Sequence, residues 1–270
     1  MIACTIAGSD SGGGAGIQAD IKTFQELGVF GTSVITALTA QSTTGVYGVE
    51  AVTPAFVAQQ LTVLLDDFNI RAMKTGMLAN ADVIAALEPL LARVEMPLIV
   101  DPVMVAKGGQ SLLQHDAVEA FKAMVLPHAT ICTPNIPEAE VLTGMKIESA
   151  SHIERAAVKL LSYGIETVII KGGHLNGDMA TDTVYSRHEE PFVVEAARAN
   201  TTQTHGTGCT FSAAITACIA KGIGVKQAIT EAKQFIDAAI KHPLHIGHGF
   251  GPTNHFAYRG KEGPHIVERS

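Results

Sequence analysis

The stretch Thr204-His205-Gly206-Thr207-Gly208-Cys209-Thr210-Phe211-Ser212 places two glycines around a threonine, directly before a run of small residues that continues to Ile219. This pattern predicts a tight turn that leads into a buried helix. The first N–H groups of a helix have no internal partners and carry partial positive charge, and glycine lets an anion approach them closely. The stretch therefore predicts an anion-binding turn beside Cys209, although a plain glycine turn before a core helix has the same local pattern.

The composition around this stretch is typical of one globular domain. Of the 270 residues, 47% are hydrophobic and 17% are charged, which supplies the apolar material for one large core. No Pro/Ser-rich linker, charge block or repeat divides the chain, so we expect a single domain over residues 1–256 and a polar tail over 257–270. The net charge of −7 argues against nucleic acid as a main partner but not against a small phosphorylated ligand.

The cellular context follows from what the sequence contains. No basic leader precedes a long apolar segment, and no apolar run approaches the ~18 residues of a membrane span, so we expect neither secretion nor membrane insertion. Cysteines at positions 4, 132, 209 and 218 form no C-x-x-C pair. They indicate reduced thiols in a cytoplasmic protein. Three have apolar neighbours and are expected in the core, and Cys209 is the exception.

Strand-like and helix-like segments alternate along the chain, which predicts an α/β fold. A strand over residues 2–7 leads into a glycine-rich loop and then a helix whose apolar residues recur at spacings of four and three. Right-handed crossovers then build a mostly parallel sheet with helices on both faces. Further strands are expected at 29–38, 45–52, 70–74, 98–100, 129–133, 167–170, 181–185 and 192–196, the last two as an antiparallel edge pair, and helices begin at Pro54, Asp82, Asp116, Ser151, after Gly208 and at Val225.

The first glycine-rich loop does not match the common nucleotide-binding motifs. Its glycines fall at positions 8, 12, 13, 14 and 16, which gives neither G-x-G-x-x-G nor a Walker A loop. A nucleotide-binding dehydrogenase is therefore disfavoured. The loop is interpreted as one wall of a ligand site, with a simple flexible turn as the alternative.

Polar residues follow the ends of several expected strands. Parallel strands bring their carboxyl ends to one edge of the sheet, where open α/β folds bind ligands. Gln41 can pair with a polar heterocycle or brace its loop. Asp101 follows the buried run 98–100, and Lys171 at the next strand end suits a phosphate contact or a solvated loop position.

Asn135 and Glu138 also lie just past a strand, and their spacing supports two interpretations. Their oxygens can hold a hydrated Mg²⁺ ion. Asn at a helix start with Glu three residues later also resembles a capping box. Both roles are compatible with one another. The late histidines (His242, His245, His248 and His255) are separated by Pro243, Gly247 and Gly249, so we expect no metal site there.

Taken together, the motifs resemble one family along most of the chain, from residue 1 to about 256. The chain is similar to the hydroxymethylpyrimidine/phosphomethylpyrimidine kinases of the ribokinase-like superfamily. The resemblance implies a three-layer α/β/α sandwich, ATP and Mg²⁺ as cofactors, and a homodimer. It also implies two successive phosphorylations in thiamine biosynthesis, of 4-amino-5-hydroxymethyl-2-methylpyrimidine and then of its monophosphate. The motifs that carry it are residues 7–20, 39–41, 74–77, 101–104, 133–140, 171–174 and 205–212.

The resemblance also implies roles for individual residues. Gln41 matches the amide that reads the pyrimidine, in a pocket with Gly8, Met77 and Val103 and with a lesser contribution from Asp20. Asn135 and Glu138 match the Mg²⁺–phosphate motif, and Asp101 and Lys171 are expected among the ATP and phosphate contacts. The N–H groups of Gly206, Thr207, Gly208 and Cys209 would form the anion hole.

One position departs from the wider superfamily. Most related sugar kinases carry Gly-Thr-Gly-Asp, with the aspartate as general base, whereas this chain has Cys209. A helix N-terminus lowers the pKa of a thiol, so Cys209 could, as a thiolate, accept the proton of the alcohol in the first phosphorylation, or the anion-binding turn around it could supply nearly all of the catalysis. The second acceptor is an anionic phosphate and needs no base.

The nearest alternative is a pyridoxal kinase of the same family. Such relatives carry a second cysteine in a mobile flap, and the corresponding residues 105–108 here contain none. Residues 107–110 are interpreted as that flap, or as an ordinary loop. Gln41 favours a pyrimidine.

Overall fold

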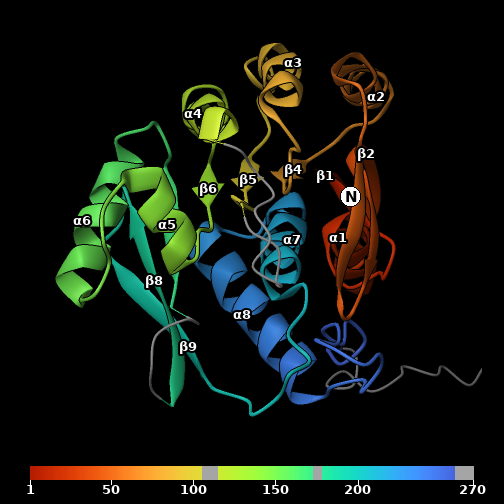
Figure 1. Ribbon diagram of the computed structural model, residues 1–270. Helices are drawn as coiled ribbons and strands as arrows, with labels where there is room; N and C mark the ends of the chain where they lie inside the picture. Colours follow the sequence, from red (N-terminus) through yellow and green to blue (C-terminus); the bar gives the residue numbers. More distant parts are fainter. Residues whose placement is uncertain (105–114, 173–177, 259–270) are drawn as a thin grey trace, which may run out of the picture.

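The computed structural model describes residues 1–104, 115–172 and 178–258, which form a nine-stranded sheet between two layers of helices (Figure 1). The sheet order is β3-β2-β1-β4-β5-β6-β7-β8-β9. The strands are β1 Ile2–Asp10, β2 Phe30–Ser42, β3 Gly45–Ala51, β4 Ala72–Thr75, β5 Leu98–Val100, β6 Ile131–Cys132, β7 Thr167–Lys171, β8 Met179–Ser186 and β9 Phe192–Ala197. The helices are α1 Gly16–Glu26, α2 Pro54–Asp67, α3 Ala81–Leu91, α4 His115–Met124, α5 Ile136–Thr143, α6 Ala150–Leu161, α7 Thr207–Ala220 and α8 Val225–Lys241, with a short 3₁₀ turn at Leu126–His128.

The centre of the sheet is parallel and its two edges are antiparallel. Strands β2, β1, β4, β5, β6 and β7 run in one direction. Strand β3 closes one edge and the β8–β9 pair closes the other. The expected α/β/α architecture and the late antiparallel pair are both confirmed.

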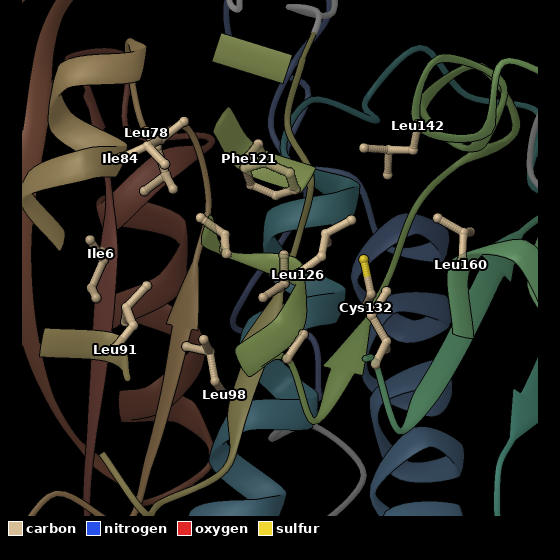
Figure 2. Packing of buried hydrophobic residues seen from close by; sticks show 14 of the residues in the cluster. Ile6, Leu78, Ile84, Leu91, Leu98, Phe121, Leu126, Cys132, Leu142 and Leu160 are labelled. Atoms are coloured by element: carbon tan, nitrogen blue, oxygen red, sulfur yellow. The ribbon is translucent and has the colours of Figure 1, made fainter. Parts of the chain in front are cut away.

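The central strands contribute side chains to two separate apolar cores, because successive side chains of a strand point to opposite faces of the sheet. In β5, Leu98 and Val100 pack with α2 to α6, whereas Ile99 packs with α1, α7 and α8. Figure 2 shows the first of these cores, with Leu98 and Cys132 from the sheet facing Phe121 and Leu160 from the helices. Burial on both faces explains the continuous apolar runs in the sequence.

Two helices begin one residue earlier than expected, and capping side chains account for this. Asn80 accepts a hydrogen bond from the N–H of Val83 at 2.9 Å, so α3 begins at Ala81 rather than Asp82. Ser149 caps α6 in the same way, and that helix begins at Ala150 rather than Ser151. Strand β6 spans only two residues instead of the expected five, since its partner β5 pairs with just these two.

The carboxyl ends of the parallel strands meet the amino ends of α1 and α7 at one edge of the sheet. Within the described ranges, no helix is both long and apolar enough to cross a membrane.

Candidate active site

A cavity of about 440 Å³ lies at the carboxyl edge of the sheet, between the two glycine-rich segments. Its walls come from strand ends, from the amino ends of α1 and α7, and from the inner face of α8. All but one of the predicted site residues line it, namely Gly8, Gln41, Met77, Asp101, Val103, Asn135, Glu138, Lys171, Gly206, Thr207, Gly208 and Cys209. The exception is Asp20.

The turn before α7 has the conformation expected of an anion-binding turn. Gly206 has φ +80°, and a Cβ there would lie 1.7 Å from the carbonyl oxygen of Gly14, so only glycine fits between the two loops. The first firm helical bond is donated by the N–H of Thr210, at 2.9 Å to Gly206. The N–H of Thr207 bonds back to Thr204 at 3.4 Å. The N–H of Thr207 is therefore partly engaged within the chain, whereas the N–H groups of Gly206, Gly208 and Cys209 have no hydrogen-bond partner among the described residues.

An ion pair lies directly against this turn. Lys171 Nζ is 3.0 Å from Asp101 Oδ1, and Thr133 donates to the same oxygen at 3.2 Å. A Cβ on Gly208 would lie 3.2 Å from Lys171 Nζ and 3.5 Å from Asp101 Oδ2. Burial alone would raise the pKa of Asp101, but Lys171 and Lys74 outweigh it and hold that pKa below its ordinary value. The carboxylate therefore stays ionised and fixes the Lys171 ammonium at the amino end of α7.

Asn135 and Glu138 form the expected capping box at the start of α5. Asn135 Oδ1 accepts from the N–H of Glu138 at 2.9 Å, and Glu138 Oε2 accepts from the N–H of Asn135 at 2.8 Å. Burial raises the pKa of Glu138 to about 7, against the lowering effect of Lys171, which lies 4.0 Å away. The box uses one carboxylate oxygen and leaves Glu138 Oε1 for other partners.

The side-chain oxygens of Asn135 and Glu138 are suitable ligands for a Mg²⁺ ion that keeps most of its water. Within residues 1–104, 115–172 and 178–258, no three His, Cys, Asp or Glu side chains are grouped so as to hold a metal. Mg²⁺ commonly takes one or two carboxylates, several waters and phosphate oxygens, so it does not need such a cage. Glu138 and Asn135 can supply this limited protein contribution.

Asp20 is not a cavity residue, which corrects the expectation of substrate contact. Its carboxylate is fully buried. Both carboxylate oxygens lie 3.0 Å from Lys74 Nζ, and Oδ2 also accepts a hydrogen bond from the hydroxyl of Thr5 at 2.6 Å. Lys74 is also fully buried. The pair therefore lies behind the cavity wall as a structural ion pair.

The thiolate form of Cys209 is disfavoured in the free protein. Burial raises the pKa of Cys209 to about 12, and Asp20 and Asp101 raise it further, while Lys74 and the N–H of Gly16 oppose them only in part. The helix N-terminus does not compensate for this loss of solvent. Cys209 is a thiol near neutral pH.

Asp10 and His205, neither of which was predicted as a site residue, join the two glycine-rich segments. Asp10 accepts the N–H groups of Gly12, Gly14 and Ala15 at 2.8, 3.0 and 2.9 Å, and its Oδ2 lies 2.8 Å from His205 Nε2. An aspartate followed by glycines is the signal of such a turn and was available in the sequence. Its bond to His205 was not, because 195 positions separate the two residues.

A second ion pair lines the far end of the cavity. Lys233 Nζ lies 2.7 Å from Asp182 Oδ2 and donates to the carbonyl of Ala180 at 2.8 Å. Asp182 also accepts the N–H of Gly172 at 3.1 Å. No motif marked these residues, since β8 and α8 meet only in the folded chain.

Within the described part of the chain, the late histidines belong to no group of three potential metal ligands. His255 is buried and lies 3.1 Å from the hydroxyl of Thr210, which places it in the core behind α7. The predicted flap at 107–110 lies outside the described residues.

Comparison with known proteins identifies the family. The sequence pattern of the phosphomethylpyrimidine kinase family matches residues 10–254. The hydroxymethylpyrimidine/phosphomethylpyrimidine kinase of Haemophilus influenzae is 52% identical over 260 residues, which cover 94% of this chain and 96% of that protein. The chain belongs to the phosphomethylpyrimidine kinase family. It is therefore a kinase, as the resemblance implied.

Solved structures of phosphomethylpyrimidine kinases and pyridoxal kinases share this fold. The ADP complex of Bacillus subtilis pyridoxal kinase has a TM-score of 0.88 and 40% identity, covering 96% of this chain and 98% of that one. The phosphomethylpyrimidine kinase of Clostridium difficile has a TM-score of 0.80 and 40% identity, covering 89% and 100%. Similarity to solved structures therefore fits both activities, and the choice between them rests on the site.

Proposed function

We propose that this kinase transfers the γ-phosphoryl group of ATP to 4-amino-5-hydroxymethyl-2-methylpyrimidine and then to the resulting monophosphate, giving the diphosphate used in thiamine biosynthesis. The observation that carries the proposal is a single cavity with Gln41 at one end and the Lys171–α7 cradle beside it. Gln41 offers both a donor and an acceptor to an aminopyrimidine. The relative from Haemophilus influenzae bears the name of this activity.

In each step, an acceptor oxygen forms a bond to the γ-phosphorus while the bond to the β-phosphate oxygen breaks and ADP leaves. The protein's part is to position the two oxygens and to neutralise the charge that spreads over the transferred group. Lys171 supplies the positive charge, and the N–H groups of Gly208 and Cys209 donate hydrogen bonds to the phosphoryl oxygens. Mg²⁺, when bound, neutralises charge on the nucleotide phosphates. Asn135 and Glu138 would hold it, mainly through water.

Cys209 contributes more to the first step than to the second. The first acceptor is a primary alcohol that must lose its proton, whereas the second is already an anion. The raised pKa of the thiol in the free protein supports a role for Cys209 as a hydrogen-bonding partner of the alcohol, whose proton passes to an oxygen of the transferred phosphoryl group as the new O–P bond forms.

The homodimer and the cytoplasmic location implied by the family belong to the same proposal. Several large apolar side chains are exposed on one side, around the β2–β3 edge and α2: Phe30, Leu38, Tyr47, Val49, Phe56 and Val63. A second copy of the chain would cover such a surface.

Pyridoxal phosphorylation is the second candidate, favoured by the structural similarity to Bacillus subtilis pyridoxal kinase. Measuring ADP release with each alcohol separates the two. We expect kcat/KM to be at least about tenfold higher for the pyrimidine. Turnover of neither alcohol would contradict the kinase assignment to this site, and preference for pyridoxal would reverse the proposed specificity.

A further inference from the structure

The carboxamide of Gln41 lies between two polar side chains at the wall of the cavity. Gln41 Oε1 is 3.0 Å from the hydroxyl of Thr39, and Gln41 Nε2 is 3.3 Å from Nε2 of His205. All three residues line the cavity. The two ends of a carboxamide have the same shape and differ only in donating or accepting hydrogen bonds, so these neighbours decide which end faces which way.

The proton on His205 Nε2 can be placed from its other partner, Asp10. The Asp10 carboxylate already accepts three backbone N–H groups, and its Oδ2 lies 2.8 Å from His205 Nε2. An ionised carboxylate only accepts hydrogen bonds, so His205 Nε2 must be the donor. A ring nitrogen that carries a proton has no free lone pair. It cannot accept a hydrogen bond from the amide nitrogen of Gln41.

The Thr39 hydroxyl leads to the same orientation from the opposite side. Its oxygen lies 2.9 Å from the carbonyl oxygen of Ser9, which can only accept, and 3.0 Å from the Gln41 amide, so placing its single proton on Ser9 satisfies that carbonyl. Toward Gln41 it therefore offers a lone pair, which requires a donor. Rotating the carboxamide by 180° about its terminal bond puts its oxygen beside His205 and its NH₂ group beside Thr39. The amide NH₂ group then donates to Thr39, and the amide oxygen faces the single N–H of His205, which it shares with the nearer Asp10 Oδ2.

We propose, on the basis of the proposed function, that His205 and Thr39 are positioning residues that lock the Gln41 carboxamide in this one orientation and so determine which ring edge is accepted. The lock leaves one N–H and one oxygen lone pair of Gln41 for the ligand. This pair is complementary to a ring nitrogen that accepts beside an exocyclic amine that donates. A 4-aminopyrimidine presents that edge, whereas the 4-oxo analogue presents a ring N–H beside a carbonyl, which is the reverse pattern.

The backbone around His205 holds the imidazole firmly enough for such a lock. The N–H of His205 donates to Gly251 O at 3.0 Å, and the N–H of Thr253 donates to His205 O at 3.1 Å. A Cβ on Gly14 would lie 2.5 Å from His205 Cδ2, so the ring sits directly on the first glycine loop. The ring therefore has little room to move away from Asp10.

The test compares two alcohols that differ only at this edge: 4-amino-5-hydroxymethyl-2-methylpyrimidine and its 4-oxo analogue. The readout is the ratio of their kcat/KM values from ADP release, because a purely structural defect lowers both values and leaves the ratio unchanged. We expect wild type to prefer the amino compound strongly, and His205→Phe to reduce that preference by about tenfold or more, since the freed amide can rotate to match either ligand.

Thr39→Val should lower the ratio in the same direction by a smaller factor. The exposed His188 provides the control His188→Phe, which should leave the ratio unchanged. A wild-type ratio in His205→Phe would overturn the proposal; if that variant does not fold, an unchanged ratio in Thr39→Val would do so. Failure of the proposed function is a separate result, since wild type itself would then not phosphorylate the amino compound.

Discussion

The buried pair between Lys74 and Asp20 should be among the most sensitive electrostatic features of the chain. Both side chains have no exposed surface, and the Nζ–Oδ1 distance is 3.0 Å. Lys74→Met leaves the Asp20 carboxylate with only the hydroxyl of Thr5. Loss of one partner of a buried pair costs about 3–5 kcal/mol. Against a typical total of about 5–15 kcal/mol, this is a large fraction of the free energy of unfolding.

Urea denaturation followed by circular dichroism measures this loss. With a slope of about 3 kcal/mol/M, Lys74→Met should lower the midpoint by roughly 1 M or more. The double variant Asp20→Asn/Lys74→Met should recover at least about 2 kcal/mol, because no uncompensated charge stays buried. The matched control is Lys241→Met. It breaks an exposed pair with Asp237 at 2.8 Å and should cost less than about 1 kcal/mol.

The same variants test the structural role assigned to Asp20. Because its side chain does not line the cavity, the KM of the double variant for the pyrimidine alcohol should change by less than about threefold. A loss below about 1 kcal/mol in Lys74→Met, or a double variant no more stable than Lys74→Met, would show that an unpaired Asp20 charge is not costly in this core. A large rise in KM without loss of stability would return Asp20 to the binding site.

Four further predictions concern residues at the amino end of α7 or packed behind it. Gly208→Ala should keep or slightly raise stability but slow turnover roughly 100-fold, because its Cβ would lie 3.2 Å from Lys171 Nζ. Gly206→Ala should instead lower the free energy of unfolding by at least about 1–3 kcal/mol, because the residue has φ +80°. Melting curves and ADP-release assays that rank the two variants alike would contradict this. Cys209→Ala should slow the first phosphorylation more than the second in separate assays, and equal slowing would rule out its preferential role. The Cys209 thiol should also react with iodoacetamide at a rate that keeps rising with pH toward about 12, so a plateau below pH 9 would be inconsistent with the raised pKa of this thiol. Burial lowers the pKa of His255 to about 4 from 6.5, so between pH 7 and pH 5 the folded state binds fewer protons than the unfolded state and stability falls as pH falls. Over this range the free energy of unfolding of wild type should fall by about 2 kcal/mol more than that of His255→Gln. Equal losses would show that His255 does not titrate in this way.

The fold could be predicted from the sequence because its signals are local. The continuous apolar run at 98–100 and the periodic helix after Gly16 reflect burial on two faces and on one face. Once the strands are parallel, Gln41, Asp101 and Lys171 must meet at one edge, and their common cavity follows from topology. Capping residues such as Asn80 move helix boundaries by one position, which propensity alone does not resolve.

The properties that the sequence did not reveal depend on distant contacts and on burial. Asp20 meets Lys74 across 54 positions, and without that contact its carboxylate resembles a substrate ligand in a glycine-rich motif. The pKa of Cys209 depends on two opposing effects, the helix terminus and the loss of solvent. Only the three-dimensional surroundings show that the second is larger.

The most direct test of the proposed function is a phosphorus NMR time course with the purified chain, 4-amino-5-hydroxymethyl-2-methylpyrimidine, ATP and Mg²⁺. We expect a monophosphate ester signal that rises first and is then replaced by the two signals of a diphosphate ester, while ADP accumulates. A monophosphate that never proceeds to the diphosphate, or no ester at all under conditions where pyridoxal is phosphorylated, would contradict it.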